Sequence, residues 1–314
     1  MITNRAVLIT GITGFIGRHL ARFLAERPGM SVWGVSRSGG RIEGVQVKPL
    51  DLATDDGIKS CWPSDRPKFD AIFHLAAFLP TSFASVETEE SFFANIKMTK
   101  NVLDFAVRDN AKFIYASSTS VYGIKQHRTP ITEETLPFPD NLYSLAKYVG
   151  ENLCGIAHLR QGLETTVLRI SAPYGPRQRL RTVINIFLQQ AFNSQDLTLY
   201  GTGQRVQDFT YVGDVVRSLQ LAYERPMSGT YNIASGKPVT MYELAKTVLT
   251  VVPGTKSRIV FSKEPDPQES YRGEFFTEKV KTELGFEAQV PLIEGLRACL
   301  ASFQRDGEST CVLA

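Results

Sequence analysis

A tyrosine and a lysine near the middle of the chain have the types and spacing needed for proton transfer. Tyr143 and Lys147 are four residues apart in the segment 141–160, whose pattern predicts a helix, so both lie on one helix face. A phenol has an ordinary pKa near ~10, too high for a base at neutral pH, and a nearby ammonium group lowers it. The pair is therefore a candidate acid–base couple. Because the same spacing is common on solvated helices, other residues must support this interpretation.

A glycine-rich turn near the start of the chain predicts a dinucleotide site. The segment 10–17 lies between an apolar, β-rich run at 6–9 and a helical pattern at 15–27. Gly11 permits a tight turn, Gly14 lets the backbone approach a pyrophosphate, and Gly17 lets helix and strand pack closely. The helix N-terminus then presents unpaired N–H groups to the phosphates. We expect cofactor contacts from Gly11, Thr13, Gly14, Phe15, Ile16 and Gly17.

The end of the second predicted strand bears on the choice between NAD and NADP. Nineteen residues after Gly17, where an acidic residue normally binds the adenosine ribose of NAD, the chain has Ser36 followed by Arg37. A carboxylate repels a 2′-phosphate, whereas a hydroxyl and a guanidinium group accept it. We expect Ser36 and Arg37 to favour NADP, with NAD as the alternative if Arg37 is simply solvated.

The glycines have the spacing T-G-x-x-G-x-x-G, and the segment 117–123 reads S-S-T-S-V-Y-G. Together with Y-x-x-x-K, these motifs resemble those of the extended short-chain dehydrogenases/reductases, the NAD(P)-dependent nucleotide-sugar epimerases and dehydratases. The resemblance runs from Val7 to about Phe286. It implies a doubly wound parallel α/β sheet of the Rossmann type with a small C-terminal α/β substrate domain.

The resemblance also implies roles at the reaction centre. Ser118, 25 residues before Tyr143, becomes the catalytic hydroxyl that holds the substrate oxygen. Tyr143 exchanges the proton, and Lys147 also binds the nicotinamide ribose. The 4,6-dehydratases of the family carry an Asp-Glu pair directly after that hydroxyl, where this chain has Thr119 and Ser120. Neither can act as an acid or base at neutral pH, so 4,6-dehydration is disfavoured, and Thr119 is left as a substrate contact beside Ser118.

Further cofactor contacts follow from the same resemblance. Asp51 and Leu52 match the pair that contacts adenine, and Leu75, Ala76 and Ala77 of the H-L-A-A segment line the ribose. Asn95 matches a helix asparagine that stabilises the active-site backbone. His74, the first residue of H-L-A-A, is equally compatible with a buried histidine at a strand end.

The substrate side departs from the family pattern. Ala172, Gln207 and Asp266 stand where the family carries an Asn and two Arg that contact the substrate diphosphate. Other arginines can supply the missing charge as phosphate clamps, and of these Arg177 and Arg205 are our expected substrate contacts. The alternative is a solvated basic loop. The cations near these positions are Arg177, Arg179, Arg181 and Arg205.

Strand and helix patterns alternate up to residue 170, which predicts right-handed βαβ units and a parallel sheet. Beyond it, Thr240-x-x-Glu243 predicts a capped helix start. We expect a dinucleotide-binding domain at 1–170 plus about 207–234. An interleaved substrate domain is expected at 171–206 and 235–314.

Composition narrows the possible partners. The 314 residues carry 35 Lys and Arg against 32 Asp and Glu, which gives no case for nucleic-acid or membrane-surface binding. The four cysteines form no C-x-x-C pair, so no metal site is expected and a reducing compartment, the cytoplasm, fits. No leader or membrane span is evident in the sequence. The two long helical segments at about 87–108 and 141–160 resemble the pair that forms the dimer interface in the family, so we expect a homodimer.

These observations favour an NAD(P)-dependent epimerase of a nucleotide-activated sugar, acting at C4. The alternative is an NADPH-dependent ketoreductase of a keto-deoxysugar nucleotide or another carbonyl compound, which Ser36 and Arg37 favour. A non-catalytic regulator that senses NADP is a remote third possibility. Such regulators typically lose the tyrosine or the lysine, whereas this chain keeps both Tyr143 and Lys147.

Overall fold

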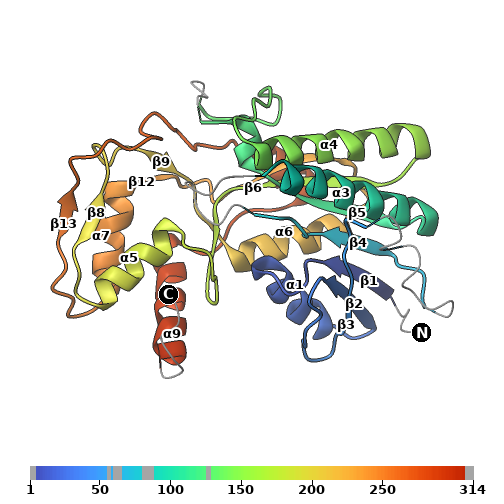
Figure 1. Ribbon diagram of the computed structural model, residues 1–314, viewed down its shortest axis with the longest axis horizontal. Helices are drawn as coiled ribbons and strands as arrows, with labels where there is room; N and C mark the ends of the chain where they lie inside the picture. The colour runs from blue at the N-terminus through green and yellow to red at the C-terminus, as the bar shows by residue number, and fades with distance from the viewer. Residues whose placement is uncertain (1–4, 55–57, 59–65, 80–87, 125–128, 308–314) are drawn as a thin grey trace.

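A seven-stranded parallel sheet forms the centre of the computed structural model, which describes residues 5–54, 58, 66–79, 88–124 and 129–307 (Figure 1). The strand order β11-β6-β5-β4-β1-β2-β3 confirms the predicted doubly wound sheet. All neighbouring strands are parallel, so their carboxyl ends meet at one edge. The strands are β1 Arg5–Thr10, β2 Met30–Ser36, β3 Gln46–Pro49, β4 Ala71–His74, β5 Lys112–Ser118, β6 Thr165–Ile170 and β11 Gly229–Ile233.

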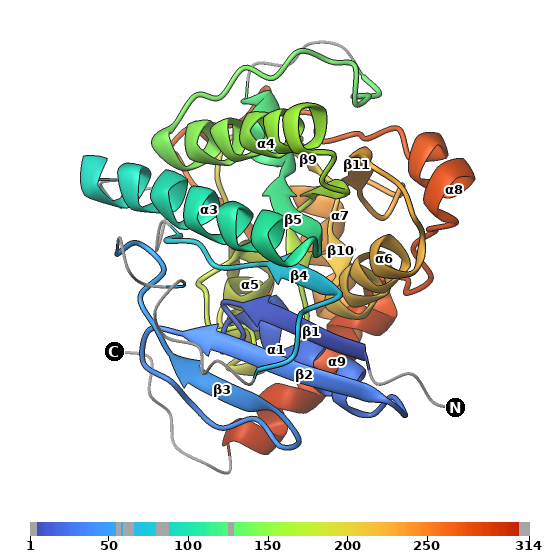
Figure 2. The same ribbon diagram turned by 90° about the vertical axis from the view of Figure 1, so that its right-hand side faces the viewer.

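Helices cover both faces of this sheet (Figure 2). Side chains alternate along β1, so Val7 and Ile9 pack against one helical layer while Ala6 and Leu8 pack against the other. The first layer holds α1 Phe15–Ala25, α6 Val212–Glu224 and α8 Glu278–Leu284, and the second holds α3 Glu89–Asp109 and α4 Leu142–Gln161. Strands buried on both faces explain the nearly continuous apolar runs in the sequence.

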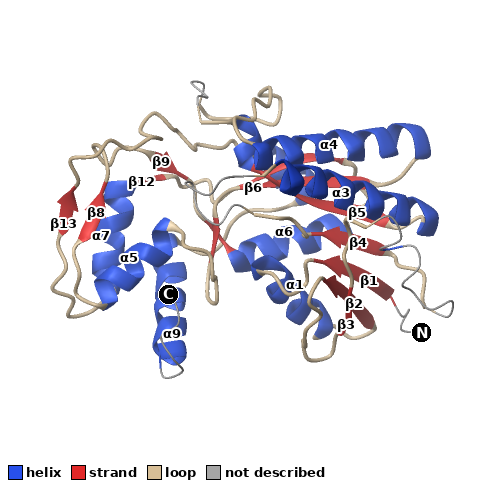
Figure 3. Cartoon of the chain, in the orientation of Figure 1, coloured by secondary structure: helices blue, strands red, loops and turns tan. Residues whose placement is uncertain are grey.

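A third apolar cluster lies outside the large sheet, on the left in Figure 3. It is built from α5 Val183–Phe192, α7 Met241–Val251 and α9 Leu292–Gly307. Helix α7 begins at the predicted capping box, in which the side chains of Thr240 and Glu243 each accept a backbone N–H of the other residue. The short pairs are β7 Pro173–Tyr174 with β10 Thr210–Tyr211, β8 Leu197–Leu199 with β13 Ile259–Phe261, and β9 Val206–Gln207 with β12 Val239–Thr240.

None of the helices in the described ranges is both long and apolar enough to cross a bilayer.

A buried ion pair joins α4 to the sheet. The guanidinium of Arg169 on β6 donates to both carboxylate oxygens of Glu151 on α4, with a closest distance of 2.7 Å. Each side chain is only 6% exposed. Ser117 at the end of β5 donates its hydroxyl to the same carboxylate, and Arg169 donates to the Tyr122 hydroxyl at 2.7 Å. Tyr122 in turn donates to Asn232 on β11 at 2.8 Å, so one network connects α4 with three strands.

Removing one member of this pair should destabilise the protein strongly. Arg169→Met leaves the Glu151 carboxylate buried without its ion-pair partner, and we expect the free energy of unfolding in urea to fall by about 3–5 kcal/mol. The double variant Arg169→Met/Glu151→Leu removes both charges and should recover much of that loss.

A solvent-exposed pair provides the matched control for this experiment. Arg258 is 81% exposed and lies 3.4 Å from Asp196, so Arg258→Met should cost less than about 1 kcal/mol. If Arg169→Met and Arg258→Met lowered the free energy of unfolding by similar amounts, the buried pair would not have the importance assigned to it.

Candidate active site

Helix α4 carries Tyr143 in its first turn and Lys147 one turn later. The Asn141 side chain accepts the Ser144 N–H at 2.8 Å and so caps the helix start. Lys147 is buried, and its Nζ donates to the Ala116 carbonyl on β5 at 2.7 Å. Burial lowers the pKa of Lys147 to about 8, while the Glu151 carboxylate acts in the opposite direction. The Lys147 Nζ lies 5.8 Å from the centre of the Tyr143 ring, close enough to influence the phenol electrostatically.

Ser118 is the last residue of β5 and lies at the same edge of the sheet. Its Oγ accepts the Ser120 N–H at 3.1 Å and caps the short helix η1, Thr119–Tyr122. The two residues before it are both held by α4: Lys147 binds the Ala116 carbonyl, and Glu151 binds the Ser117 hydroxyl. Sequence reasoning overlooked Glu151, although its position four residues after Lys147 places it on the same helix face.

The glycine turn packs tightly against the end of β4. Gly11 has φ +66°, and a Cβ there would lie 2.8 Å from the backbone of Ala76. A Cβ on Gly17 would lie 2.3 Å from the Gly11 carbonyl, so both positions need glycine. Helix α1 begins after Gly14 with no side-chain cap. Its first N–H groups therefore have no side-chain acceptor at this end, which fits the binding of a pyrophosphate.

His74 is a buried histidine that organises the strand end beside this turn. The Thr10 Oγ1 accepts the Leu75 and Ala76 N–H groups, so its own proton points to the His74 Nδ1, 2.7 Å away. The Nε2 therefore carries the ring proton and donates to the Thr99 Oγ1 at 3.1 Å. Burial lowers the pKa of His74 to about 3, so the ring is neutral. Leu75 and Ala76, both expected at the cofactor ribose, are thus fixed by hydrogen bonds, and Ala77 follows them.

The predicted adenosine end of the site is at β2. The Ser36 Oγ donates to the Gly39 carbonyl at 2.7 Å, and the exposed Arg37 guanidinium lies 4.3 Å from the centre of the Phe78 ring. Asn95 binds the backbone of Phe78 through both ends of its amide, at 2.8 and 3.1 Å. Asn95 therefore fixes the platform on which Arg37 stacks.

The pair that we expect to contact adenine lies just after β3. The Asp51 carboxylate accepts the Ala53 N–H at 2.9 Å, and Leu52 is buried in the core.

Tyr271 is a second residue that sequence reasoning overlooked. Its hydroxyl interacts with the side chain of Thr119, the buried residue after Ser118. Burial raises the pKa of Tyr271 to about 12, so the phenol stays protonated. No local motif marks Tyr271, because backbone pairing with the distant Val206 brings it to the site: the Val206 N–H donates to the Tyr271 carbonyl at 3.1 Å.

The two arginines expected at the substrate lie in different settings. Arg205 forms an ion pair with Asp266, with 2.9 Å between Nε and Oδ2, and donates to the Gln268 side chain at 2.7 Å. Arg177 is exposed and lies near α1, where His19 donates from Nε2 to the Pro176 carbonyl at 3.1 Å.

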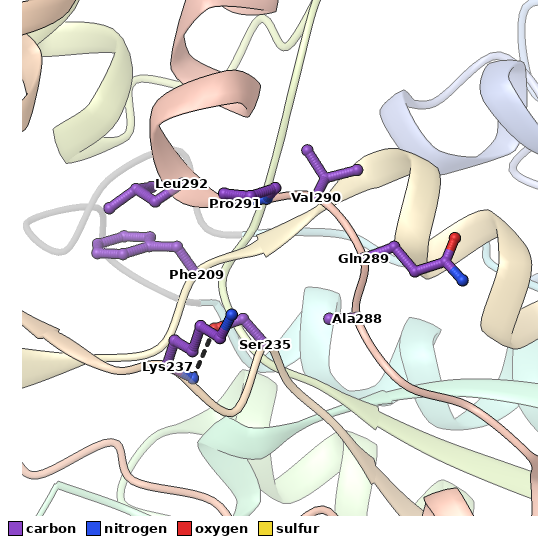
Figure 4. A pocket seen from close by; sticks show the side chains of 8 residues that line it. All are labelled: Phe209, Ser235, Lys237, Ala288, Gln289, Val290, Pro291 and Leu292. Atoms are coloured by element: carbon purple, nitrogen blue, oxygen red, sulfur yellow. Dashed lines mark hydrogen bonds between the residues drawn. The ribbon is translucent and has the colours of Figure 1, made fainter.

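A separate pocket opens where the segment before α9 meets the residue after Asp208 (Figure 4). None of the predicted catalytic or cofactor residues lines it. Within the described ranges, no three His, Cys, Asp or Glu side chains are grouped as a metal site would need. The pocket is lined by Phe209, Ser235, Lys237, Ala288, Gln289, Val290, Pro291 and Leu292.

Comparisons with known proteins indicate the family of this chain. Residues 7–234 match the model of the NAD dependent epimerase/dehydratase family. A UDP-N-acetyl-alpha-D-glucosaminuronate decarboxylase of Bacillus cytotoxicus is 30% identical over 78% of this chain and 79% of its own length.

Solved structures of nucleotide-sugar epimerases are similar to this chain over almost its whole length. The UDP-glucose 4-epimerase of Thermotoga maritima with UDP-glucose has a TM-score of 0.85 and 28% identity, over 96% of this chain and 99% of the other. The UDP-glucuronic acid 4-epimerase of Bacillus cereus, in complex with UDP-glucuronic acid and NAD, has a TM-score of 0.81 and 26% identity over the same shares. With a parallel sheet, a glycine turn at its β1–α1 connection and a family match over 228 residues, the chain belongs to the NAD-dependent epimerase/dehydratase family, the nucleotide-sugar enzymes of the extended short-chain dehydrogenase/reductase type.

Proposed function

We propose that the protein is an NAD(P)-dependent epimerase that inverts C4 of a nucleotide-activated sugar. The observation that carries this proposal is the arrangement on β5 and α4, where Lys147 holds the strand two residues before Ser118 and lies beside Tyr143. The next residues, Thr119 and Ser120, are hydroxyls, so the site has no carboxylate there for dehydration. The similar 4-epimerases support the same reaction.

The chemistry of the residues fits a reversible oxidation of a carbinol. When bound, the nicotinamide cofactor supplies the acceptor and donor of the hydride. Ser118 holds the C4 oxygen by a hydrogen bond. Tyr143 takes the hydroxyl proton as the C4–H bond breaks, which leaves a ketone, and returns the proton when hydride is restored to the opposite face. The Lys147 ammonium stabilises the phenolate form of Tyr143 during this exchange.

A one-way NADPH-dependent ketoreductase is the second candidate, and the pair Ser36-Arg37 is the observation that favours it. The state of the purified protein separates the two. An epimerase regenerates its cofactor in each cycle and should retain tightly bound oxidised cofactor. A reductase should be isolated with an empty site that takes up NADPH.

The described cysteines, Cys154 and Cys299, are buried free thiols. They support a reducing compartment such as the cytoplasm.

Tyr143→Phe should leave the fold intact and reduce turnover by about 10²–10⁴-fold, because the ring still packs while the proton partner is lost. Ser118→Ala should lose somewhat less, and Lys147→Met should impair both turnover and cofactor binding. Epimerisation of a panel of UDP-sugars, followed by NMR, measures turnover, and calorimetry measures cofactor affinity. Tyr148→Phe is the control: Tyr148 directly follows Lys147, but it points to another side of the helix and packs against the cluster that contains Val121 and Tyr122. Near-normal turnover of Tyr143→Phe would rule out the mechanism.

We infer that NADP(H) binds more tightly than NAD(H), because the end of β2 offers the cation Arg37 on its Phe78 platform and no carboxylate. Arg37→Ala should weaken NADP(H) binding by about tenfold and leave NAD(H) binding unchanged. Fluorescence titration of both cofactors checks this, with the nearby exposed Arg41→Ala as control. Equal or tighter binding of NAD(H) by the unmodified protein would refute the preference.

The exposed faces of α3 and α4 support a homodimer. Leu145, Ile156 and Leu159 lie within about 60° of one another around α4, and Leu159 is 84% exposed. Phe93 is exposed on α3, which lies beside α4 (Figure 2). We propose that a second copy of the chain covers this surface.

Light scattering at micromolar concentration should give the mass of a dimer. Ile156→Asp/Leu159→Asp should convert it to a monomer, because each protomer would bring two buried charges to the interface. Phe192→Asp, at an exposed position on α5, should leave the dimer intact. A monomeric mass for the unmodified protein would reject this assembly.

A further inference from the structure

The ion pair between Arg205 and Asp266 lies close to the reaction centre. Arg205 directly precedes Val206, whose N–H donates to the Tyr271 carbonyl at 3.1 Å, and the Tyr271 hydroxyl interacts with the side chain of Thr119. Thr119 directly follows Ser118. The side chains of Tyr271 and Thr119 therefore lie between the ion pair and Ser118. The ion pair is on the side of the site formed by β9 and the segment 266–272.

We call the side formed by β9 and the segment 266–272 the β9 wall. Arg205 is the cation of this wall that an anionic substrate could contact. It directly precedes β9, in which side chains alternate between two faces, so Arg205 shares a face with the uncharged Gln207. Arg272, the arginine of the segment 266–272, instead donates to the backbone carbonyls of Glu269 and Tyr271 at 2.9 and 3.0 Å.

Arg205 is already engaged. Its side chain is 15% exposed and that of Asp266 10%, so the two charges face each other largely out of water. The contact is incomplete: although Nε and Oδ2 are 2.9 Å apart, the buried Arg205 N–H at Nε has no aligned acceptor. A better-placed anionic oxygen would satisfy that donor, at the cost of displacing the Asp266 carboxylate.

We propose that Asp266 is a specificity-determining residue, an internal counter-ion that competes with the substrate's diphosphate for Arg205. The diphosphate therefore binds weakly to Arg205. This inference rests on the proposed function, because it takes the substrate to be a nucleotide sugar. The counter-ion Asp266 distinguishes this chain from an enzyme whose arginine is free to bind phosphate.

Asp266→Asn is a suitable probe of the competition. The asparagine oxygen can still accept the Gln268 N–H, which Asp266 accepts at 2.9 Å, so the local turn is kept while the negative charge is removed. Arg205 is then left as an unpaired, largely buried cation. An anion that reaches it gains a charge-assisted hydrogen bond, worth about 10–100-fold in affinity.

The experiment measures UDP and uridine binding by calorimetry. We expect Asp266→Asn to bind UDP about 10–100-fold more tightly than the unmodified protein, with uridine binding unchanged. The double variant Arg205→Gln/Asp266→Asn should lose this gain. Asp196→Asn removes the same charge from the exposed pair with Arg258 and should change UDP affinity by less than about twofold. Equal UDP affinity in Asp266→Asn and the unmodified protein, or a gain that persists in the double variant, would overturn the proposal.

A parallel assay of UDP-sugar epimerisation separates this inference from the proposed function. Turnover by the unmodified protein without a gain in Asp266→Asn rejects the role of Asp266 and keeps the epimerase. A gain in UDP affinity that Arg205→Gln abolishes, without epimerase turnover, keeps the role of Asp266 and rejects the epimerase.

Discussion

The attachment of α4 to the end of β5 is the constraint on which the rest of the site depends. Lys147 and Glu151, one helical turn apart, bind consecutive residues of the strand: the Ala116 carbonyl and the Ser117 hydroxyl. Ser118 comes next in the strand, and Tyr143 lies one turn earlier in the helix. The distance between a proton donor and a substrate oxygen must be held to fractions of an ångström. Two polar contacts between the same pair of elements fix that relation more firmly than apolar packing alone.

The same contacts explain why a buried charge is tolerated there. The Glu151 carboxylate receives hydrogen bonds from Ser117 and Arg169, and Arg169 is further satisfied by the Tyr122 hydroxyl. The carboxylate also opposes the effect of burial on the pKa of Lys147. Glu151, which binds Arg169 in the core, thus also keeps Lys147, the proposed catalytic lysine, closer to its charged form, which is the form that stabilises a phenolate.

The sequence is sufficient to predict the parallel sheet, the glycine turn and the pair Tyr143-Lys147, because each depends on local periodicity or fixed spacing. Glu151 follows from the same helical spacing once it is considered. The contacts of Arg37 with Phe78 and of Arg205 with Asp266 are not predictable in this way. They join segments about 40 and 60 residues apart, and no repeat or spacing in the sequence relates those segments. The tautomer of His74 likewise depends on a chain of hydrogen bonds that runs from the Leu75 N–H through Thr10 to Thr99.

The segment 271–276 constrains how this protein can change over evolutionary time. At one end it is hydrogen-bonded to Val206, and at the other the Ile131 N–H donates to the Glu274 carbonyl while the Phe276 N–H donates back to Ile131. One end is paired with Val206 and the other with Ile131. If a residue were inserted or deleted between them, the side chains that follow the change would point to the opposite face of the extended segment. Substitutions in this segment, as at Tyr271, can therefore keep its position, whereas a change in length would break the register.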